Sequence, residues 1–119
     1  MSKTALYEVV FAVKPDLSRQ DVDKLADEYL EVLKELGGKQ IKREYWGLRG
    51  LAYKIQKTSK AHYMLLGVEA SATAIAEISR KLRINENVIR NLVTRVEAID
   101  EKPSPIVRSY DDNDAASAA

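Results

Sequence analysis

Residues 39–69, KQIKREYWGLRGLAYKIQKTSKAHYMLLGVE, contain the pattern that decides the fold of this chain. Two stretches rich in β-branched, aromatic and other apolar residues, 39–56 and 60–69, are joined around residues 57–59, which predicts two adjacent strands. Two glycines interrupt the first stretch, Gly47 and Gly50. They predict a bulge or a bend in that strand. In the second stretch, one face is expected to carry Met64, Leu66 and Val68.

The segment before this hairpin has the pattern of a strand followed by a helix. Residues 5–13 alternate in character, and Pro15 ends the strand. The odd positions are expected to face the core, namely Tyr7, Val9, Phe11 and Val13. Ser18 can cap a helix, with Asp21 at the capping-box position and the glycines at 37–38 as a left-handed stop. The buried face of this helix is expected to hold Val22, Leu25, Ala26, Tyr29, Leu33 and Leu36.

The segment after the hairpin repeats the order of a helix and a strand. Ser71 can begin the second helix, and Asn85 lies near its end. Its apolar stripe is Ile75, Ile78 and Leu82. Residues 88–96 form the last strand, with apolar residues at both parities, so that its faces cannot be assigned.

The predicted fold class is α+β. The order strand, helix, strand, strand, helix, strand, joined by right-handed crossovers, gives the ferredoxin-like βαββαβ arrangement, with a four-stranded antiparallel sheet and two helices on one face. The domain is expected to span residues 1–98. Residues 99–119 are expected to form a flexible tail, because they contain two prolines and a polar, alanine-rich end.

Composition limits the possible partners and compartments. A chain of 119 residues, 45% of them hydrophobic, is long enough for one domain. The absence of cysteine excludes disulfides and thiolate chemistry, and it fits a cytoplasmic protein. The N-terminal apolar run is too short to span a bilayer and lacks a signal-peptide cleavage site, so no membrane partner is expected.

Charge is segregated along the chain although its net value is only +1. Residues 39–60 hold seven basic residues against one acid, and residues 80–95 hold five against one. Residues 16–36 and 97–119 each carry a net charge of −4. Two basic segments of this kind indicate a polyanionic partner.

Catalysis has little support in the sequence. His62 is the single histidine, so no Ser–His or Cys–His pair can form without it, and it is expected to have no catalytic role. No spacing supplies converging metal ligands, and neither a cofactor nor a small-molecule substrate is expected. An acylphosphatase-like enzyme of this fold needs an anion-binding loop after the first strand. The loop here is Lys14-Pro15-Asp16, in which the proline lacks an N–H and the aspartate repels anions.

An RNA-recognition motif shares this topology and stacks bases on aromatic residues of its two central strands. In this chain the first strand offers Glu8 on the open face. The third strand offers Tyr63, but its sequence HYMLLGVE does not match the aromatic-rich octet of that motif. The open face is therefore not expected to be a stacking platform.

The basic hairpin is better explained by contact with phosphate. Cations on an edge strand protect against edge-to-edge aggregation, which accounts for two or three of them. Seven cations between Lys39 and Lys60 exceed that need, and each neutralised phosphate adds affinity by releasing counterions. Three aromatic residues lie among these cations as packing residues or as base or ribose contacts: Tyr45, Trp46 and Tyr53.

Four stretches together resemble bacterial small-subunit ribosomal protein six. They are YEVVFAVKPDL from Tyr7, YWGLRGLAYKI from Tyr45, KAHYML from Lys60 and RKLRINENVIRNLVTR from Arg80. The resemblance covers about Tyr7 to Arg95, and the segment from Trp46 to Tyr53 is its most specific part. The family has the βαββαβ fold that the pattern predicts.

The resemblance implies a non-enzymatic role in the small ribosomal subunit. Members of the family bind the central domain of small-subunit ribosomal RNA together with ribosomal protein eighteen, so these two are the expected partners. The candidate RNA-binding or partner-binding residues lie in the two basic segments: Lys42, Arg43, Trp46, Arg49, Tyr53, Lys54, Lys57, Lys60, His62, Tyr63, Arg80, Arg83 and Arg90. Which of them face RNA and which face the partner protein stays open. The alternative function is a ferredoxin-like enzyme or a ligand-sensing domain.

Overall fold

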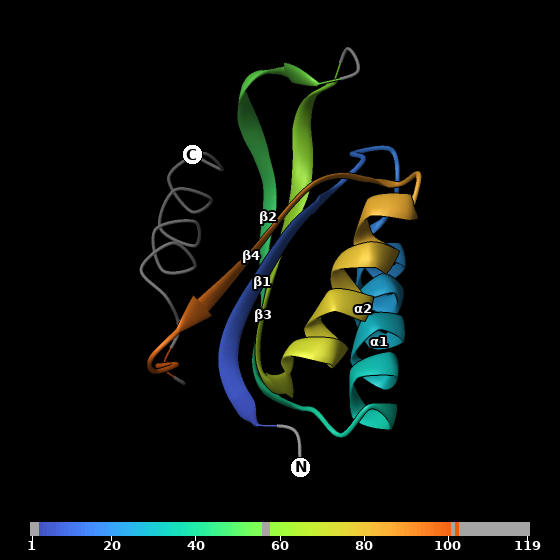
Figure 1. Cartoon of the computed structure of the whole chain (residues 1–119). Coiled ribbons are helices and arrows are strands. Elements are labelled where there is room, and N and C mark those ends of the chain that lie inside the picture. Colours follow the sequence, from blue (N-terminus) through green and yellow to red (C-terminus); the bar gives the residue numbers. More distant parts are fainter. Residues whose placement is uncertain (1–2, 56–57, 101, 103–119) are drawn as a thin grey trace.

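The protein has six regular elements in the computed structural model, which describes residues 3–55, 58–100 and 102 but not the side chains of residues 51–55 and 58. They are β1 (Thr4–Val13), α1 (Arg19–Glu35), β2 (Lys39–Ile55), β3 (Thr58–Ser71), α2 (Ala72–Ile84) and β4 (Val88–Val96). The strands form one antiparallel sheet in the order β2-β3-β1-β4, with both helices on the same face (Figure 1). The predicted α+β, ferredoxin-like fold is confirmed.

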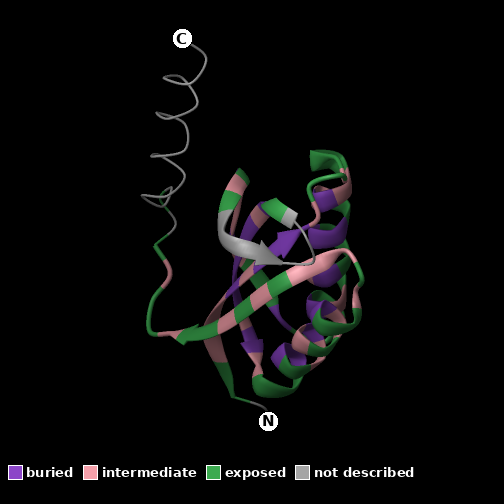
Figure 2. Ribbon diagram, turned by 90° about the horizontal axis from the view of Figure 1, so that it is seen from above, coloured by how far each residue is buried: buried purple, intermediate pink, exposed green. Residues whose placement is uncertain are grey.

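The core lies between the sheet and the two helices, where Figure 2 shows the buried residues gathered. Val9, Phe11 and Val13 of β1 are buried as predicted, and Tyr7 packs against them. The Phe11 ring meets the Tyr29 ring of α1 edge to face, with 5.6 Å between centroids, a favoured geometry for aromatic pairs. The face of β3 that was predicted to carry Met64, Leu66 and Val68 is also buried in this core.

Helix α1 begins and ends through local hydrogen bonds that the sequence predicts. The Asp21 N–H donates to Ser18 Oγ and the Ser18 N–H donates to the Asp21 carboxylate, each over 3.1 Å. These two bonds lower the pKa of Asp21 from its ordinary value, because they favour the charged carboxylate. Gly37 ends the helix at φ 87°, a left-handed conformation that glycine adopts without steric cost. The prediction was wrong for Leu36, which caps the helix with its side chain 45% exposed.

The two edge strands differ in how they meet the sheet. In β2 the register shifts between Tyr45 and Gly47, where Gly47 has φ 85°, which confirms the predicted bulge. In β4 the structure assigns the faces that the sequence left open. Val88 and Val93 pack against the core, whereas Leu92 is 61% exposed on the opposite, open face.

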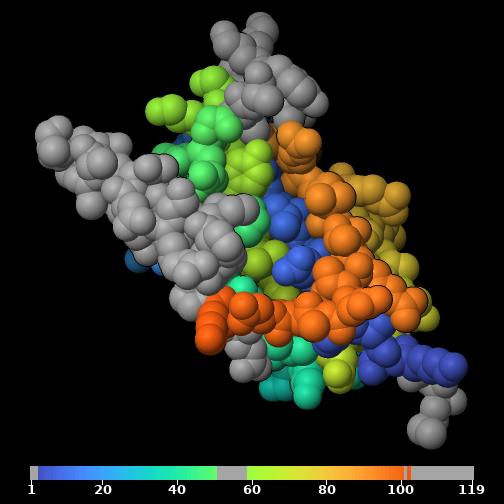
Figure 3. All heavy atoms as spheres, turned by 90° about the vertical axis from the view of Figure 1, so that its left-hand side faces the viewer, coloured from blue at the N-terminus to red at the C-terminus, as the bar shows by residue number. Residues whose placement is uncertain are grey.

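The open face of the sheet, opposite the one that α1 and α2 cover, is partly covered by residues 97–100 (Figure 3). The nearest heavy atom to a Cβ built on Gly67 of β3 would be Ile99 Cγ2, at 3.1 Å. A Cβ at this position would require a shift of a few tenths of an ångström, so glycine favours the close approach of this segment to the sheet. Ile99 belongs to the segment that the sequence assigned to the tail. The predicted boundary after residue 98 thus stays a prediction, with Ile99 already in contact with the sheet.

Candidate nucleic-acid interface

Lys42 of β2 is held inside the fold rather than presented to solvent. Its Nζ lies 2.6 Å from the Asp100 main-chain oxygen and 3.5 Å from Glu44 Oε2. The side chains of Lys42 and Glu44 are each only 8% exposed. A buried charge needs such partners, because unpaired burial is costly. Lys42 therefore serves the packing of residues 97–100 onto the open face.

Arg43, the next residue of β2, points to the opposite face and bridges to α1. Its guanidinium donates to Asp27 Oδ1 over 2.6 Å, to the Asp23 main-chain oxygen over 3.0 Å and to Asp23 Oδ1 over 3.3 Å. Burial alone would lower the pKa of Arg43, but the hydrogen bonds and charges of Asp27 and Asp23 raise it. Arg43 therefore ties the edge strand β2 to the acidic helix.

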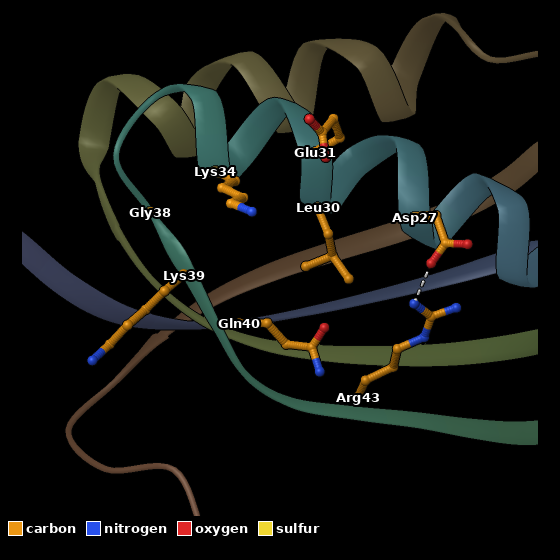
Figure 4. Close-up of a pocket in the computed structure, with 8 residues that line it drawn as sticks. All are labelled: Asp27, Leu30, Glu31, Lys34, Gly38, Lys39, Gln40 and Arg43. Atoms are coloured by element: carbon orange, nitrogen blue, oxygen red, sulfur yellow. Dashed lines mark hydrogen bonds and ion pairs between the residues drawn. The ribbon is translucent and has the colours of Figure 1, made fainter.

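A groove of about 530 Å³ lies beside this bridge, between α1 and the start of β2 (Figure 4). Leu30 and Glu31 come from the helix and Gln40 from the strand, with the Arg43–Asp27 pair at one end. Acidic and basic side chains both line the groove, so it shows no preference for a polyanion.

His62 of β3 is 5% exposed and is fixed by two hydrogen bonds of 2.7 Å. Because the Leu17 main-chain oxygen can only accept, His62 Nε2 carries the proton and donates to it. His62 Nδ1 then accepts from the Tyr45 hydroxyl. The Tyr45 ring also lies under Arg19, whose Cζ is 4.5 Å from the ring centroid. His62 thus joins the hairpin to the loop after β1.

Trp46 and Tyr63 are partly buried and belong to the open face. Trp46 Nε1 donates to Glu44 Oε1 over 3.1 Å, which orients the indole beside β2. Tyr63 has the opposite parity to the core residues Met64 and Leu66, and it pairs with Ala12 and with Gly47. Both aromatic residues can therefore be reached from the side of the sheet opposite the helices.

Three further candidate cations lie at one end of the sheet, the end where β1 stops and β4 starts. Lys60 pairs with Gly50 near the tip of the hairpin, and Arg90 pairs with Ala12 near the end of β1. Arg83 belongs to the last turn of α2, which leads directly into β4. All three are exposed, and none of them forms an ion pair with the residues that the structure describes. Arg49 lies nearby and is partly buried. We call Lys60, Arg83 and Arg90 the basic end.

Arg80 differs from these cations because it is already paired. It donates to Glu77 Oε1 over 2.6 Å and to Oε2 over 3.2 Å, one turn back on α2. This pairing raises the pKa of Arg80 and lowers that of Glu77.

Three of the candidate residues lie outside the side chains that the structure describes: Tyr53, Lys54 and Lys57.

Sequence reasoning missed two cations next to the basic end. Lys14 follows β1 and its N–H donates to the Asn87 oxygen before β4, over 3.0 Å. Arg19 opens α1 beside Tyr45. Neither residue belongs to one of the two basic segments, so counting charge along the sequence could not find it. The predicted crossover topology could have indicated these two cations, because it brings the end of β1 next to the start of β4.

Other kinds of site find no support within the described ranges. No group of three or more histidine, aspartate and glutamate side chains there could hold a metal ion. No helix of the described chain is long and apolar enough to cross a membrane. The described surface offers exposed cations and two partly exposed aromatic side chains on a small α+β, ferredoxin-like frame. These are the features by which a nucleic-acid-binding protein of this class is recognised.

Comparisons with known proteins give the particular family. The family model for Ribosomal protein S6 matches residues 6–95. The chain is 44% identical over 105 residues to small ribosomal subunit protein bS6 of Rickettsia bellii, with 88% of each chain covered. It is 52% identical over 102 residues to the protein of the same name from Gluconacetobacter diazotrophicus, covering 86% of this chain and 63% of that one. The chain belongs to the ribosomal protein S6 family.

A solved structure confirms the fold independently. The crystal structure of 30S ribosomal protein S6 from Thermotoga maritima superposes with a TM-score of 0.73 at 19% identity, covering 98% of this chain and all of that one. Membership of a ribosomal protein family also makes the chain a structural protein rather than an enzyme, as the sequence predicted.

Proposed function

We propose that this protein is a component of the small subunit of the bacterial cytoplasmic ribosome, where it binds the central domain of ribosomal RNA together with ribosomal protein eighteen. The observation that carries the RNA contact is the basic end, where Lys60, Arg83 and Arg90 are exposed and unpaired within the described chain. Each cation that reaches a phosphate releases counterions, so the contact is electrostatic and independent of base sequence.

The candidate residues divide into two groups by what already holds them. Lys42, Arg43 and His62 are engaged inside the domain, so we assign them to the support of the hairpin and not to RNA. The exposed cations of the basic end are assigned to RNA, whereas an RNA contact for the partly buried Arg49 stays a prediction of the sequence. The side chains of Tyr53, Lys54 and Lys57 lie outside the described residues, and a phosphate contact for the two lysines stays a prediction of the sequence.

A salt titration of binding to the central domain of small-subunit ribosomal RNA tests this function. With about four to six phosphate contacts, the logarithm of the association constant should fall against the logarithm of salt with a slope of roughly −3 to −5. Adding ribosomal protein eighteen should tighten the binding, because two proteins that bind together share the ordering of the RNA. A slope near zero would contradict the phosphate contact, and no effect of protein eighteen would contradict the partnership.

A further inference from the structure

We propose that the open face of the sheet, next to the basic end, holds one unpaired base of single-stranded RNA against Tyr63, with Arg90 at a phosphate of the same strand. The inference rests on the proposed function, since it requires RNA at this end of the molecule. It goes further by assigning the face, the side chains and the chemical class of the contacted group.

The residues directly opposite Tyr63 in the sheet are small, and its side chain is partly exposed. Its direct neighbours across the sheet are Gly47 on β2 and Ala12 on β1. Directly opposite residues have Cβ atoms about 5 Å apart, so a large neighbour would cover the ring. Glycine and alanine do not reach it. Ala61, two residues before Tyr63 on the same face, is small as well.

Arg90 continues the same row of the sheet. It pairs with Ala12, which itself pairs with Tyr63, so Tyr63 and Arg90 are two strand spacings apart, about 10 Å between Cα atoms. Arg90 is exposed, and its long side chain can cover part of that distance. An aromatic ring for the base and a cation for the backbone are the two elements with which proteins bind single-stranded nucleic acid.

Two carboxylates of the neighbouring strands on this face, Glu8 and Glu44, do not oppose the contact. Glu8 pairs with Gly67 and Thr94, four residues before Ala12 along β1, or about 13 Å away. Glu44 accepts from Trp46 and lies 3.5 Å from Lys42, so its charge is compensated. The site therefore differs from the platform of an RNA-recognition motif, which needs aromatic residues in the row that holds Glu8.

The shape of the face limits where a strand of RNA can lie. In Figure 3, β1 (blue) and β3 (yellow-green) form the central part of the open face, between β2 and β4. The segment at residues 97–100 crosses the lower end of this face. Ile99 occupies the surface over Gly67 there. The part of the open face around Tyr63 lies away from this segment, towards the tip of the hairpin and the basic end.

The test uses the full-length protein and a 12-nucleotide oligoadenylate, with a duplex RNA of the same length for comparison. The variant Tyr63→Leu should bind the oligoadenylate about 5- to 150-fold more weakly than wild type, because it loses one stacked base. The variant Tyr63→Phe keeps the ring, so its affinity should stay within about twofold of wild type. The salt slope should not change with Tyr63→Leu, because no phosphate contact is lost. Arg90→Gln should reduce the slope by about 0.7, and Arg95→Gln, at the far end of the same strand, should not.

Controls separate the base site from general effects. Leu92→Ala alters the same face without removing a ring and should leave oligoadenylate binding unchanged. Duplex binding should be equal for wild type and Tyr63→Leu, because paired bases cannot stack on the ring. Trp46 is the only tryptophan of the chain, and its fluorescence in the wild-type protein should be quenched by oligoadenylate but not by the duplex. This measurement needs no variant, so it holds even if Tyr63→Leu folds poorly.

Three results would overturn the base site. Unchanged binding by a folded Tyr63→Leu variant, with binding weakened by Arg90→Gln, would leave phosphate contact and the proposed function intact while removing the base. Loss of protein eighteen binding in Tyr63→Leu, with RNA affinity intact, would make the face a protein interface. The absence of any salt-dependent RNA binding by the wild-type protein would remove the proposed function and the base site together.

Discussion

The start of β2 and the basic end carry similar charge in the sequence but differ in what the fold does with it. At the start of β2, Lys42 reaches the Asp100 oxygen and Arg43 reaches two aspartates of α1. At the basic end, Lys60, Arg83 and Arg90 point to solvent without an ion-pair partner in the described chain. A run of cations therefore mixes side chains that hold the domain together with side chains that are available to a polyanion, and only their surroundings distinguish them.

The largest expected effect of this difference concerns RNA affinity. Replacing Lys60, Arg83 and Arg90 by glutamine should weaken binding to ribosomal RNA about 100- to 500-fold at about 0.1 M salt and reduce the salt slope by about 2 to 3. The matched control replaces Lys3, Lys34 and Lys39, three exposed lysines at the other end of the sheet. It removes the same charge and should have a much smaller effect. Equal losses in a filter-binding titration would show that only net charge matters.

His62 gives the largest effect on stability. His62→Leu should lower the free energy of unfolding by about 2–4 kcal/mol, because the Leu17 oxygen and the Tyr45 hydroxyl lose their buried partner. His62→Gln, which can still donate to one of them, should cost less. Urea denaturation measures both. RNA affinity of the folded variants should stay near that of wild type, and a selective loss of affinity would place His62 at the interface.

Two truncations examine the segment that Lys42 holds. Ending the chain after Ala98 removes Ile99 from Gly67 and the Asp100 oxygen from Lys42, and should cost about 1–3 kcal/mol. Ending it after Lys102 keeps both contacts and should change stability by less than about 0.5 kcal/mol. Thermal melts compare the two. Coincident melts would support the predicted domain boundary after residue 98.

Arg43 is expected to have a smaller effect, because its partners are exposed. Asp27 and Asp23 have side-chain exposures of 66% and 41%, so water screens the pairs. Arg43→Gln should lower the free energy of unfolding by about 0.5–1 kcal/mol and leave RNA binding nearly unchanged. If RNA binding fell as it does for Arg90→Gln, the division between the two groups of cations would be wrong for this residue.

The smallest effect is a dependence on pH at the acidic helix. The folded state lowers the pKa of Asp21 below its ordinary 3.8, so the carboxylate contributes stability above that value and loses it as the pH falls through the lowered pKa. Asp21→Asn should remove this part of the decline between about pH 5 and pH 2. Urea midpoints across that range measure it. The affinity of the basic end depends on lysine and arginine and should not follow the same curve.

Much of the fold was readable because its signals are local. The capping box at Ser18 and the bulge at Gly47 depend on residues within one turn or one strand. Leu36 was misassigned because it continues the helical spacing although the helix has already ended at Glu35. The faces of β4 could not be read, because the strand carries apolar residues at both parities and only its pairing with β1 decides between them.

The candidate site was predicted only in part. Its residue types and two basic segments follow from the sequence, because charge density does not depend on the fold. Whether a cation is available depends on neighbours far away in the chain: Asp100 is 58 residues from Lys42, and Leu17 is 45 residues from His62. No pattern within a segment could indicate these pairs.

The sequence by itself determined the element order, the family and the two basic segments that indicate a polyanionic partner, since periodicity, capping residues and charge density are properties of short segments. The tertiary structure decided which side chains remain available. It placed Arg43 against α1 and Lys42 under residues 97–100, and it left Tyr63 and Arg90 in one accessible row. The physical reason is that charged and polar groups are satisfied by whatever partners folding brings near, and those partners come from distant parts of the chain.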